Sequence, residues 1–212
     1  LGRVVIHFDL ADNQQPLQLD FQQTPEHVQS VSNALGAIDY ELSNEHLIIM
    51  PGALKQGTNR LEIDFIAGEN SLNRNPEYLY TLFVPDRART AFPLFDQPDL
   101  KAHYQLSLRV PADWEAISNA PLKERKEDDQ GVVYHFENSE LTSSISFHSS
   151  PESFSECPET SMVARSACCI GKLTMPRSRA TWTPFLRCIT TQFIGWRTTL
   201  VFPTRSRNSI LP

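Results

Sequence analysis

Histidine and cysteine are the side chains with which this chain could most readily hold a metal ion. It has six histidines and four cysteines. A helical zinc site of the form H-E-x-x-H needs two histidines four residues apart. The histidines are His7, His27, His46, His103, His135 and His148, and the cysteines are Cys157, Cys168, Cys169 and Cys188. No two histidines have that spacing, no Cys-x-x-Cys pair occurs, and adjacent cysteines make poor joint ligands. The sequence therefore predicts no metal ligand and no catalytic residue in this chain.

The elements that would carry any site are predicted to be strands. Apolar and polar residues alternate along Ile6–Leu10, Leu17–Phe21, Leu61–Phe65 and Tyr104–Val110, as on strands with one buried face. A fifth alternating run, Val132–Phe136, follows a turn-forming Asp-Asp-Gln-Gly sequence. We expect a mostly β fold, an antiparallel saddle-like sheet or β-sandwich, followed by a poorly structured tail.

Two stretches are less clear. His27–Leu35 could be a short amphipathic helix, or equally a strand and a turn. Glu115–Asp129 is rich in charge and is predicted to be a solvated hairpin tip.

Composition changes abruptly near residue 145. Residues 1–145 hold 22 Asp and Glu against 11 Lys and Arg, a balance of −11, whereas residues 146–212 hold 3 against 8, a balance of +5. All four cysteines and no aspartate lie in the second part. The sequence predicts a β domain over 1–145, with its start truncated at Leu1, and a tail of different origin over 146–212.

Charge and hydropathy exclude some classes of function. The balance of −11 over residues 1–145 argues against a nucleic-acid partner, which would favour a basic surface. No apolar run approaches 18 residues, so no membrane span is predicted. Leu1 opens directly into strand-like sequence, so we expect a signal peptide to be absent or already removed.

The segment from Tyr78 to Ala102 is the most specific motif. It reads Y-L-Y-T-L-F-V-P-D-R-A-R-T-A-F-P-L-F-D-Q-P-D-L-K-A, and S-N-A-P follows at residues 118–121. This is similar to the amino-terminal domain of zinc aminopeptidases of the aminopeptidase N family, with T-Q-F-E-P-x-x-A-R-x-x-F-P-C-F-D-E-P-x-x-K-A and then S-N-x-P. The matching residues are Phe83, Pro85, Ala88, Arg89, Phe92, Pro93, Phe95, Asp96, Pro98, Lys101, Ala102, Ser118 and Asn119.

The same residues predict an ordered loop on physical grounds. Its three prolines fix φ and remove hydrogen-bond donors, so the segment cannot be helical. Phe92 and Phe95 would anchor it to a core, and Arg89 and Asp96 would pair if both are buried. Pro93, Pro98 and Lys101 complete the set of residues expected to hold the loop rather than to react.

The resemblance implies an enzyme that removes amino-terminal residues from peptides with a zinc ion. In the full-length relative an H-E-x-x-H helix holds the zinc and a G-x-M-E-N strand binds the substrate amine, and both are absent here. This chain is therefore predicted to be an inactive fragment without a cofactor. Phe83, Val84 and Pro85 are expected to border the substrate cleft. Val84 stands where many relatives have an acidic residue that helps to bind the substrate amine, while Leu94 and Gln97 replace a cysteine and a glutamate.

The tail suggests a shifted reading frame. If the third base of each codon is joined to the first two of the next, residues 144–155 permit Y-L-F-S-F-I-A-G-K-F-Q, and residues 170–189 permit an amphipathic helix. Residues 194–211 permit W-M-E-D-Y-T-G-I-P-Y-P-F-E-K-F-D-F, similar to the family's Y-x-G-x-P-Y-P-F-x-K. We hypothesise a one-base slip near residues 141–145.

A second class of function stays open from the sequence, namely a free-standing β-sandwich module that binds peptide or carbohydrate. Tyr78, Tyr80, Trp114 and Tyr134 could form an aromatic platform for such a ligand.

Overall fold

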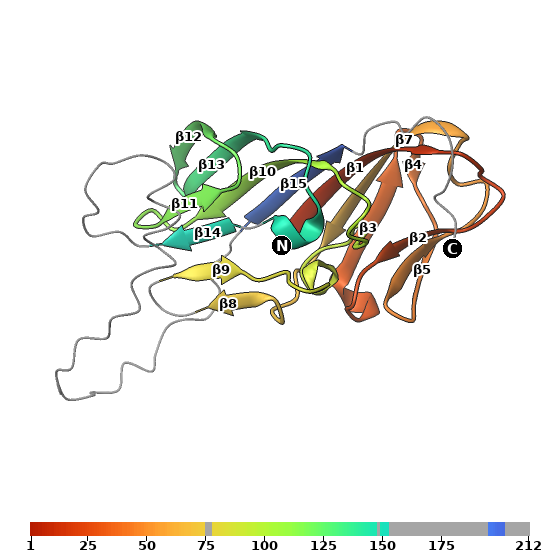
Figure 1. The fold of residues 1–212 in the computed structure, drawn as a ribbon, viewed down its shortest axis with the longest axis horizontal. Helices are drawn as coiled ribbons and strands as arrows, with labels where there is room; N and C mark the ends of the chain where they lie inside the picture. Colours follow the sequence, from red (N-terminus) through yellow and green to blue (C-terminus); the bar gives the residue numbers. More distant parts are fainter. Residues whose placement is uncertain (75–77, 148, 153–194, 202–212) are drawn as a thin grey trace. The chain divides into compact units, whose positions relative to one another are not determined.

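The computed structural model describes residues 1–74, 78–147, 149–152 and 195–201. The chain divides into two compact units, residues 1–153 with 193–212, and residues 154–192. The second unit lies outside the described residues. All the described residues belong to the first unit, which Figure 1 shows as an all-β structure.

The larger sheet has eight strands in the order β12-β13-β10-β15-β1-β7-β3-β4 (Figure 1). Their bounds are β12 Leu122–Asp128, β13 Gly131–Asn138, β10 His103–Val110, β15 Gly195–Val201, β1 Gly2–Leu10, β7 Gly57–Phe65, β3 Val28–Asn33 and β4 Gly36–Ala37. Each pairing between these strands is antiparallel except that of β1 with β15. The sheet is therefore built from strands at both ends of the sequence.

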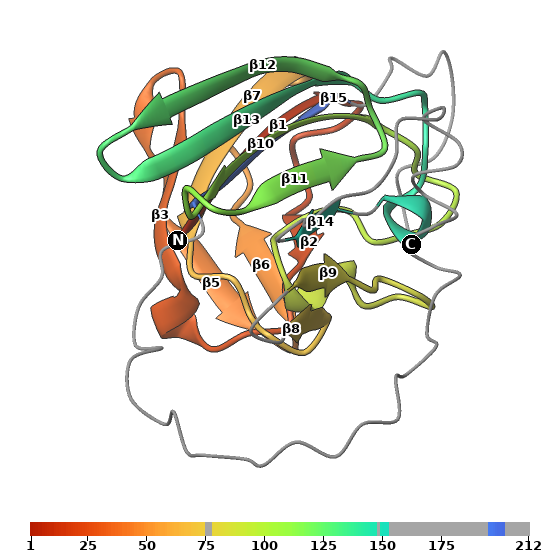
Figure 2. The same ribbon diagram turned by 90° about the vertical axis from the view of Figure 1, so that its left-hand side faces the viewer.

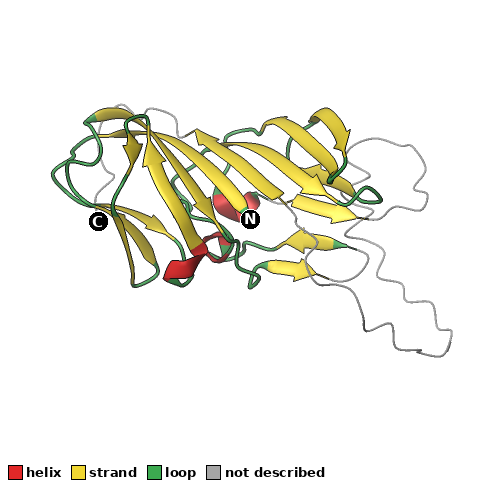
Figure 3. Cartoon of the chain, turned by 180° about the vertical axis from the view of Figure 1, so that it is seen from behind, coloured by secondary structure: helices red, strands yellow, loops and turns green. Residues whose placement is uncertain are grey.

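Three smaller sheets complete the described structure, in the orders β2-β6-β5, β8-β9 and β11-β14 (Figure 2). Their bounds are β2 Leu17–Asp20, β5 Tyr40–Ser43, β6 His46–Ile49, β8 Leu72–Arg74, β9 Leu79–Thr81, β11 Glu115–Ser118 and β14 Ser149–Glu152. The described helices are three 3₁₀ turns, drawn red in Figure 3: η1 Pro25–His27, η2 Ala88–Thr90 and η3 Ser144–Ser146.

Local sequence explains where several of these strands turn. Asn44 and Glu45, between β5 and β6, have φ angles of 50° and 67°, the left-handed geometry that a two-residue type I′ hairpin requires. Gly131, after the β12–β13 turn, has φ of 125°. A residue with a Cβ atom rarely adopts such angles, so glycine is favoured there.

The core lies between the large sheet and the small β2-β6-β5 sheet (Figure 2). Ile6, Leu61 and Ile63 of the large sheet and Leu19 and Leu47 of the small one are completely buried. Burying such a side chain contributes roughly 1.5–3 kcal/mol. The alternation of the sequence thus becomes the inner faces of two packed sheets.

The predicted fold class is confirmed. Each of the five alternating runs lies on a strand, β1, β2, β7, β10 or β13, with Phe21 just beyond the end of β2. His27–Leu35 is not a helix, because η1 ends at His27 and β3 occupies Val28–Asn33. The charge-rich stretch includes a whole exposed strand, β12, as well as a hairpin turn. Among the described residues, no helix is long and apolar enough to cross a membrane.

Beyond the predicted boundary at residue 145, the structure describes two strands, β14 and β15. Phe147 is also buried, with 1% of its surface exposed. The remaining expectations for the tail fall on residues outside the described ones.

Candidate functional site

The loop between β9 and β10 contains the motif that the sequence singles out. Near its start lies Phe83, which is buried, followed by Val84, which is 52% exposed, and by the exposed Pro85. The peptide bond between Val84 and Pro85 is cis. Phe83 therefore fixes the start of the loop in the core, while the next two residues face outwards.

Aromatic rings hold the loop. The ring of Phe83 lies 5.8 Å from that of Phe92, edge to face, and 6.3 Å from that of Phe147, stacked. Phe147 in turn stacks on Tyr104 of β10, with 4.3 Å between ring centroids. Farther along the loop, Phe95 packs edge to face on another ring of the core, with 5.9 Å between centroids. Such aromatic pairs add about 0.5–1.5 kcal/mol beyond the area that they bury.

The buried carboxylate of Asp96 organises the middle of the loop. Its two oxygens accept hydrogen bonds from the Ser144 hydroxyl, at 2.6 Å, and from the Arg89 backbone amide, at 3.0 Å. The Asp96 amide donates to the carboxylate of Asp20 at 2.8 Å. Burial raises the pKa of the Asp96 carboxyl above its ordinary value, although these two hydrogen bonds to its oxygens oppose the shift.

The expected ion pair between Arg89 and Asp96 does not form. The Arg89 guanidinium, half-exposed, pairs instead with Asp86, three residues earlier, and also donates to the Asp86 carbonyl at 3.0 Å. Asp86 lies in the turn that leads into η2, three residues before Arg89, and this local carboxylate rather than the buried Asp96 pairs with the Arg89 side chain. Arg89 reaches Asp96 only through its backbone amide.

Backbone hydrogen bonds join the loop to β2 and the residues after it. The Asp20 and Leu94 backbones exchange two bonds, at 2.8 and 3.2 Å, and the Gln22 amide donates to the Arg89 carbonyl at 2.9 Å. Pro93 is buried, whereas Pro98 and Lys101 are exposed beyond the clamped part. Asp20 and Ser144 are thus structural partners of the loop that the sequence pattern does not reveal, because they lie 76 and 48 residues from Asp96.

A polar hollow of about 540 Å³ opens beside the start of the loop. Its lining comprises Val84, Pro85, Asp86, Arg87, Arg89 and Thr90 of the loop, with Gln22, Glu45 and Asn70 facing them. The Gln22 amide donates to the Glu45 carboxylate at 2.7 Å. Charges of both signs border the hollow, so it suits a polar ligand with groups of both kinds.

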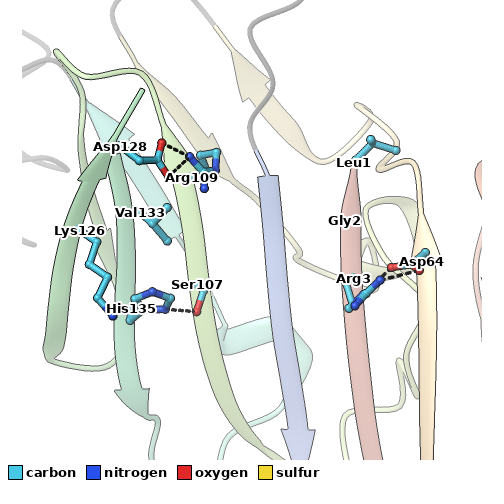
Figure 4. Close-up of a pocket in the computed structure, with 10 residues that line it drawn as sticks. All are labelled: Leu1, Gly2, Arg3, Asp64, Ser107, Arg109, Lys126, Asp128, Val133 and His135. Carbon is cyan, nitrogen blue, oxygen red and sulfur yellow. Dashed lines mark hydrogen bonds and ion pairs between the residues drawn. The ribbon is translucent and has the colours of Figure 1, made fainter. Parts of the chain in front are cut away.

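A second hollow, of about 460 Å³, crosses the outer face of the large sheet (Figure 4). Its charges are already compensated, since Arg3 pairs with Asp64 at 2.6 Å and Arg109 with Asp128 at 2.5 Å. The Ser107 hydroxyl lies 2.8 Å from Nδ1 of His135. No carboxylate that hydrogen-bonds to His135 is described, so the arrangement lacks the third member of a catalytic triad.

The aromatic platform considered from the sequence does not assemble as one surface. Tyr78 and Tyr80 are each 40% exposed, with ring centroids 6.0 Å apart. Tyr134 is buried, and its hydroxyl donates to the Trp114 carbonyl at 3.2 Å.

The donor set does not fit a zinc ion. Among the described residues, no three side chains of His, Cys, Asp or Glu gather closely enough to hold a metal. The full sequence also lacks H-E-x-x-H. The zinc implied by the resemblance would need ligands from outside the residues that the structure describes.

Sheets packed on a common core, with an ordered loop between β9 and β10, define a β domain. A model of the Peptidase M1 N-terminal domain matches residues 2–145. The chain belongs to this peptidase family through that domain.

Several relatives are similar over this region. The chain is 49% identical over 61 residues to aminopeptidase N of Streptomyces lividans, covering 28% of this chain and 6% of the relative. It is 35% identical over 109 residues to probable aminopeptidase 1 of Sulfurisphaera tokodaii, covering 47% of this chain and 13% of the relative. The match thus spans only a small part of each relative's length.

The fold also resembles a solved structure, the M1 zinc metallopeptidase from Deinococcus radiodurans. The TM-score is 0.56 at 13% sequence identity, over 71% of this chain and 40% of that one. At this identity the likeness supports the fold alone.

Proposed function

We propose that this chain supplies the non-catalytic β domain of a zinc aminopeptidase that releases amino-terminal residues from peptides. The match of the M1 N-terminal domain to residues 2–145 carries this proposal. Relatives named aminopeptidases support the parent activity. The sequence contains neither the H-E-x-x-H zinc motif nor the amine-binding G-x-M-E-N motif.

Phe83, Val84 and Pro85 are proposed to border the substrate cleft of the parent enzyme. Support comes from the polar hollow beside Val84 and Pro85 and from the rigid attachment of Phe83 beneath it. Many relatives have a carboxylate at this position, which would attract the substrate's ammonium group. In this chain Val84 offers an apolar surface instead. Arg89, Phe92, Pro93, Phe95, Asp96, Pro98 and Lys101 are proposed to maintain the loop and not to react.

An activity assay tests the proposal that the chain is inactive by itself. The purified chain, supplied with zinc, is incubated with leucine p-nitroanilide and the release of nitroaniline is followed. We expect no release above that of a buffer blank, because the sequence lacks the H-E-x-x-H motif that would hold a zinc-bound water. Hydrolysis that depends on added metal and copurifies with the chain would contradict the proposal.

We also propose that residues 146–212 arise from a shifted reading frame. The change of charge from −11 to +5 and the family-like strings permitted in one constant shift support this origin. Sequencing the DNA around the codons for residues 141–145 tests it. We expect to find a single inserted or deleted base, and downstream of it a reading frame that encodes H-E-x-x-H. One continuous frame that encodes Cys168-Cys169 would contradict the proposal.

A further inference from the structure

One interior position of the large sheet is filled by a strand from far along the chain. β15 lies between β1 and β10, and no pairing joins β1 directly to β10. Six residues of β15 pair with β1 and seven pair with β10. Within the described residues, β15 is thus the single link between β12-β13-β10 on one side and β1-β7-β3-β4 on the other (Figure 1).

The two outer edges of the sheet are poor places for adding a strand. Every residue of β12 is exposed, and Lys123–Asp128 are all charged. At the other edge, β4 has only two residues. Charged and very short edge strands discourage pairing with another chain. The position between β1 and β10, here called the slot, therefore offers the longest unblocked hydrogen-bonding edges when β15 leaves.

The inner side of the slot is apolar. Val4 and Leu106 flank its centre and Ile6 lies one pair farther along, all at most 1% exposed. At the centre, β15 places Thr198, which is 3% exposed and whose hydroxyl has no hydrogen-bond partner among the described residues. An unpaired buried hydroxyl is unfavourable. Leu200, in contrast, is fully buried and matches its neighbours.

The outer side of the slot is polar. Its neighbours there include Arg3 with Asp64 on one side and Ser107 with His135 on the other (Figure 4). A well-matched occupant is therefore an extended segment with aliphatic residues at the inward positions and neutral polar residues at the outward ones. Thr199 of β15, half-exposed between Val5 and Gln105, already meets the outward requirement.

We propose that the slot is a strand-binding site, which accepts an extended segment of another polypeptide with aliphatic inward residues in place of β15. Main-chain hydrogen bonds to β1 and β10 supply the affinity, as in other complexes formed by strand addition, and the inward positions supply the selectivity. The proposal rests on Thr198 and the strand order alone, and it does not depend on the peptidase assignment.

Peptide binding to the full 212-residue chain tests the proposal. The probe is a fluorescein-labelled peptide of the Gly195–Val201 sequence carrying Thr198→Val, followed by fluorescence anisotropy. We expect saturable binding about tenfold tighter than that of the unaltered peptide, since the unpaired hydroxyl is gone. A peptide carrying Thr198→Asp serves as the control and should not bind, because it would bury a charge.

Hydrogen exchange identifies where the peptide binds. With the Thr198→Val peptide bound, the backbone amides of Gly195–Val201 in the chain should lose protection while those of β1 and β10 keep theirs. Absence of saturable binding, or binding that leaves the β15 amides protected, would overturn the proposal.

Variants of the chain distinguish binding at the slot from non-specific binding of the peptide. Thr198→Val in the chain makes its own β15 fit better, so the peptide should bind about tenfold more weakly, because the open slot is less populated. Thr199→Val on the outward face should leave the affinity unchanged. Thr198→Ser keeps the hydroxyl and should bind at least as tightly as the unaltered chain. Equal affinity for Thr198→Val and Thr199→Val would overturn the proposal.

Discussion

At the level of single residues, two buried polar side chains differ in their hydrogen bonding: Tyr104 of β10 and Asp96 of the loop. The phenol of Tyr104 is 1% exposed and its hydroxyl has no hydrogen-bond partner among the described residues. Burial raises the pKa of Tyr104, and the Asp96 carboxylate adds to the shift. Asp96 is also buried, but it accepts hydrogen bonds from Ser144 and the Arg89 amide. The unpaired Tyr104 hydroxyl therefore lowers the stability of the fold, whereas the Asp96 carboxylate fixes the positions of Ser144 and the Arg89 backbone.

Tyr104→Phe is expected to stabilise the chain by about 1–2 kcal/mol at pH 7, because it removes an unpaired buried hydroxyl and keeps the ring stack. The free energy of unfolding from urea titration measures this. Tyr134→Phe is the matched control. It should destabilise by about 1 kcal/mol, since the Tyr134 hydroxyl donates to the Trp114 carbonyl.

The same tyrosine predicts a loss of stability in alkali. The folded pKa of Tyr104 exceeds the unfolded value of about 10. Above that pH the unfolded chain loses the proton while the folded chain retains it, so the unfolding free energy falls as pH rises. Tyr104→Phe should lack this part of the decline between about pH 9.5 and 11. An identical decline in both proteins would count against the buried phenol.

Asp96 predicts a pH dependence in the acid range. Its folded pKa is raised, so the folded chain binds more protons between the unfolded pKa of about 3.9 and the folded one. The contribution of Asp96 to stability is therefore fully present below that unfolded pKa and is lost as pH rises through the folded pKa. Relative to Asp96→Asn, the unaltered chain should gain stability as pH falls from 6 towards 4. Asp99→Asn, at an exposed position, controls for the change in net charge, and an opposite slope for Asp96 would contradict the geometry.

At the level of elements, two hairpin glycines have similar backbone angles but different surroundings. Gly131 and Gly36 have nearly equal φ angles, 125° and 130°. A Cβ atom on Gly131 would lie 2.3 Å from the Val110 carbonyl oxygen, whereas one on Gly36 would meet nothing within 4 Å. The two glycines therefore separate backbone strain from steric contact.

Gly36→Ala should cost about 1–2 kcal/mol, the strain of a positive φ alone. Gly131→Ala should cost at least about 1 kcal/mol more, because the β13 start must also move away from β10. Thermal unfolding of both variants alongside the unaltered chain measures the difference. Equal losses would show that the β10–β13 contact at Val110 yields without cost.

Much of the architecture could be predicted because it follows from local alternation. β1, β7 and β10 each bury every second residue, and the pattern is visible in the sequence. β12 could not be assigned a face this way, because all its residues are exposed and its strand geometry comes from pairing with β13. The place of β15 depends on one partner, β1, whose residues lie 194 positions away, and on another, β10, whose residues lie 86 to 98 positions away, and periodicity encodes neither.

The loop shows the same limit. Its order and its anchoring by Phe92 follow from prolines and apolar residues close in sequence. The prediction that the Arg89 side chain pairs with Asp96 was wrong. Its partner is Asp86, and charge type alone does not distinguish the two aspartates. The Asp20 and Ser144 contacts require the folded chain, since both residues belong to distant elements.

At the level of the whole molecule, the proposed role can be tested in a chimera. Residues 2–145 replace the matching segment of Streptomyces lividans aminopeptidase N, the host's own following residues are kept so that a strand is available to pair with β1 and β10, and Val84→Glu is then introduced. A carboxylate beside the cleft should lower KM for a free-amine dipeptide anilide by about three- to tenfold. Leu35→Glu, at a position 95% exposed, is the control and should leave KM unchanged. If the chimera is active but both substitutions act alike, Val84 does not border the cleft.

The central position of β15 also governs the order in which the molecule can be completed. β1 can pair with β7 once Phe65 is synthesised, and β10 with β13 once Asn138 is. The two parts cannot be joined until Val201, 63 residues after Asn138, has left the ribosome. At 5–20 residues per second, this leaves the apolar edges of β1 and β10 unpaired for roughly 3–13 s. During synthesis, the nascent chain therefore exposes a surface suited to chaperones, and slowed translation of the last codons should lengthen that exposure.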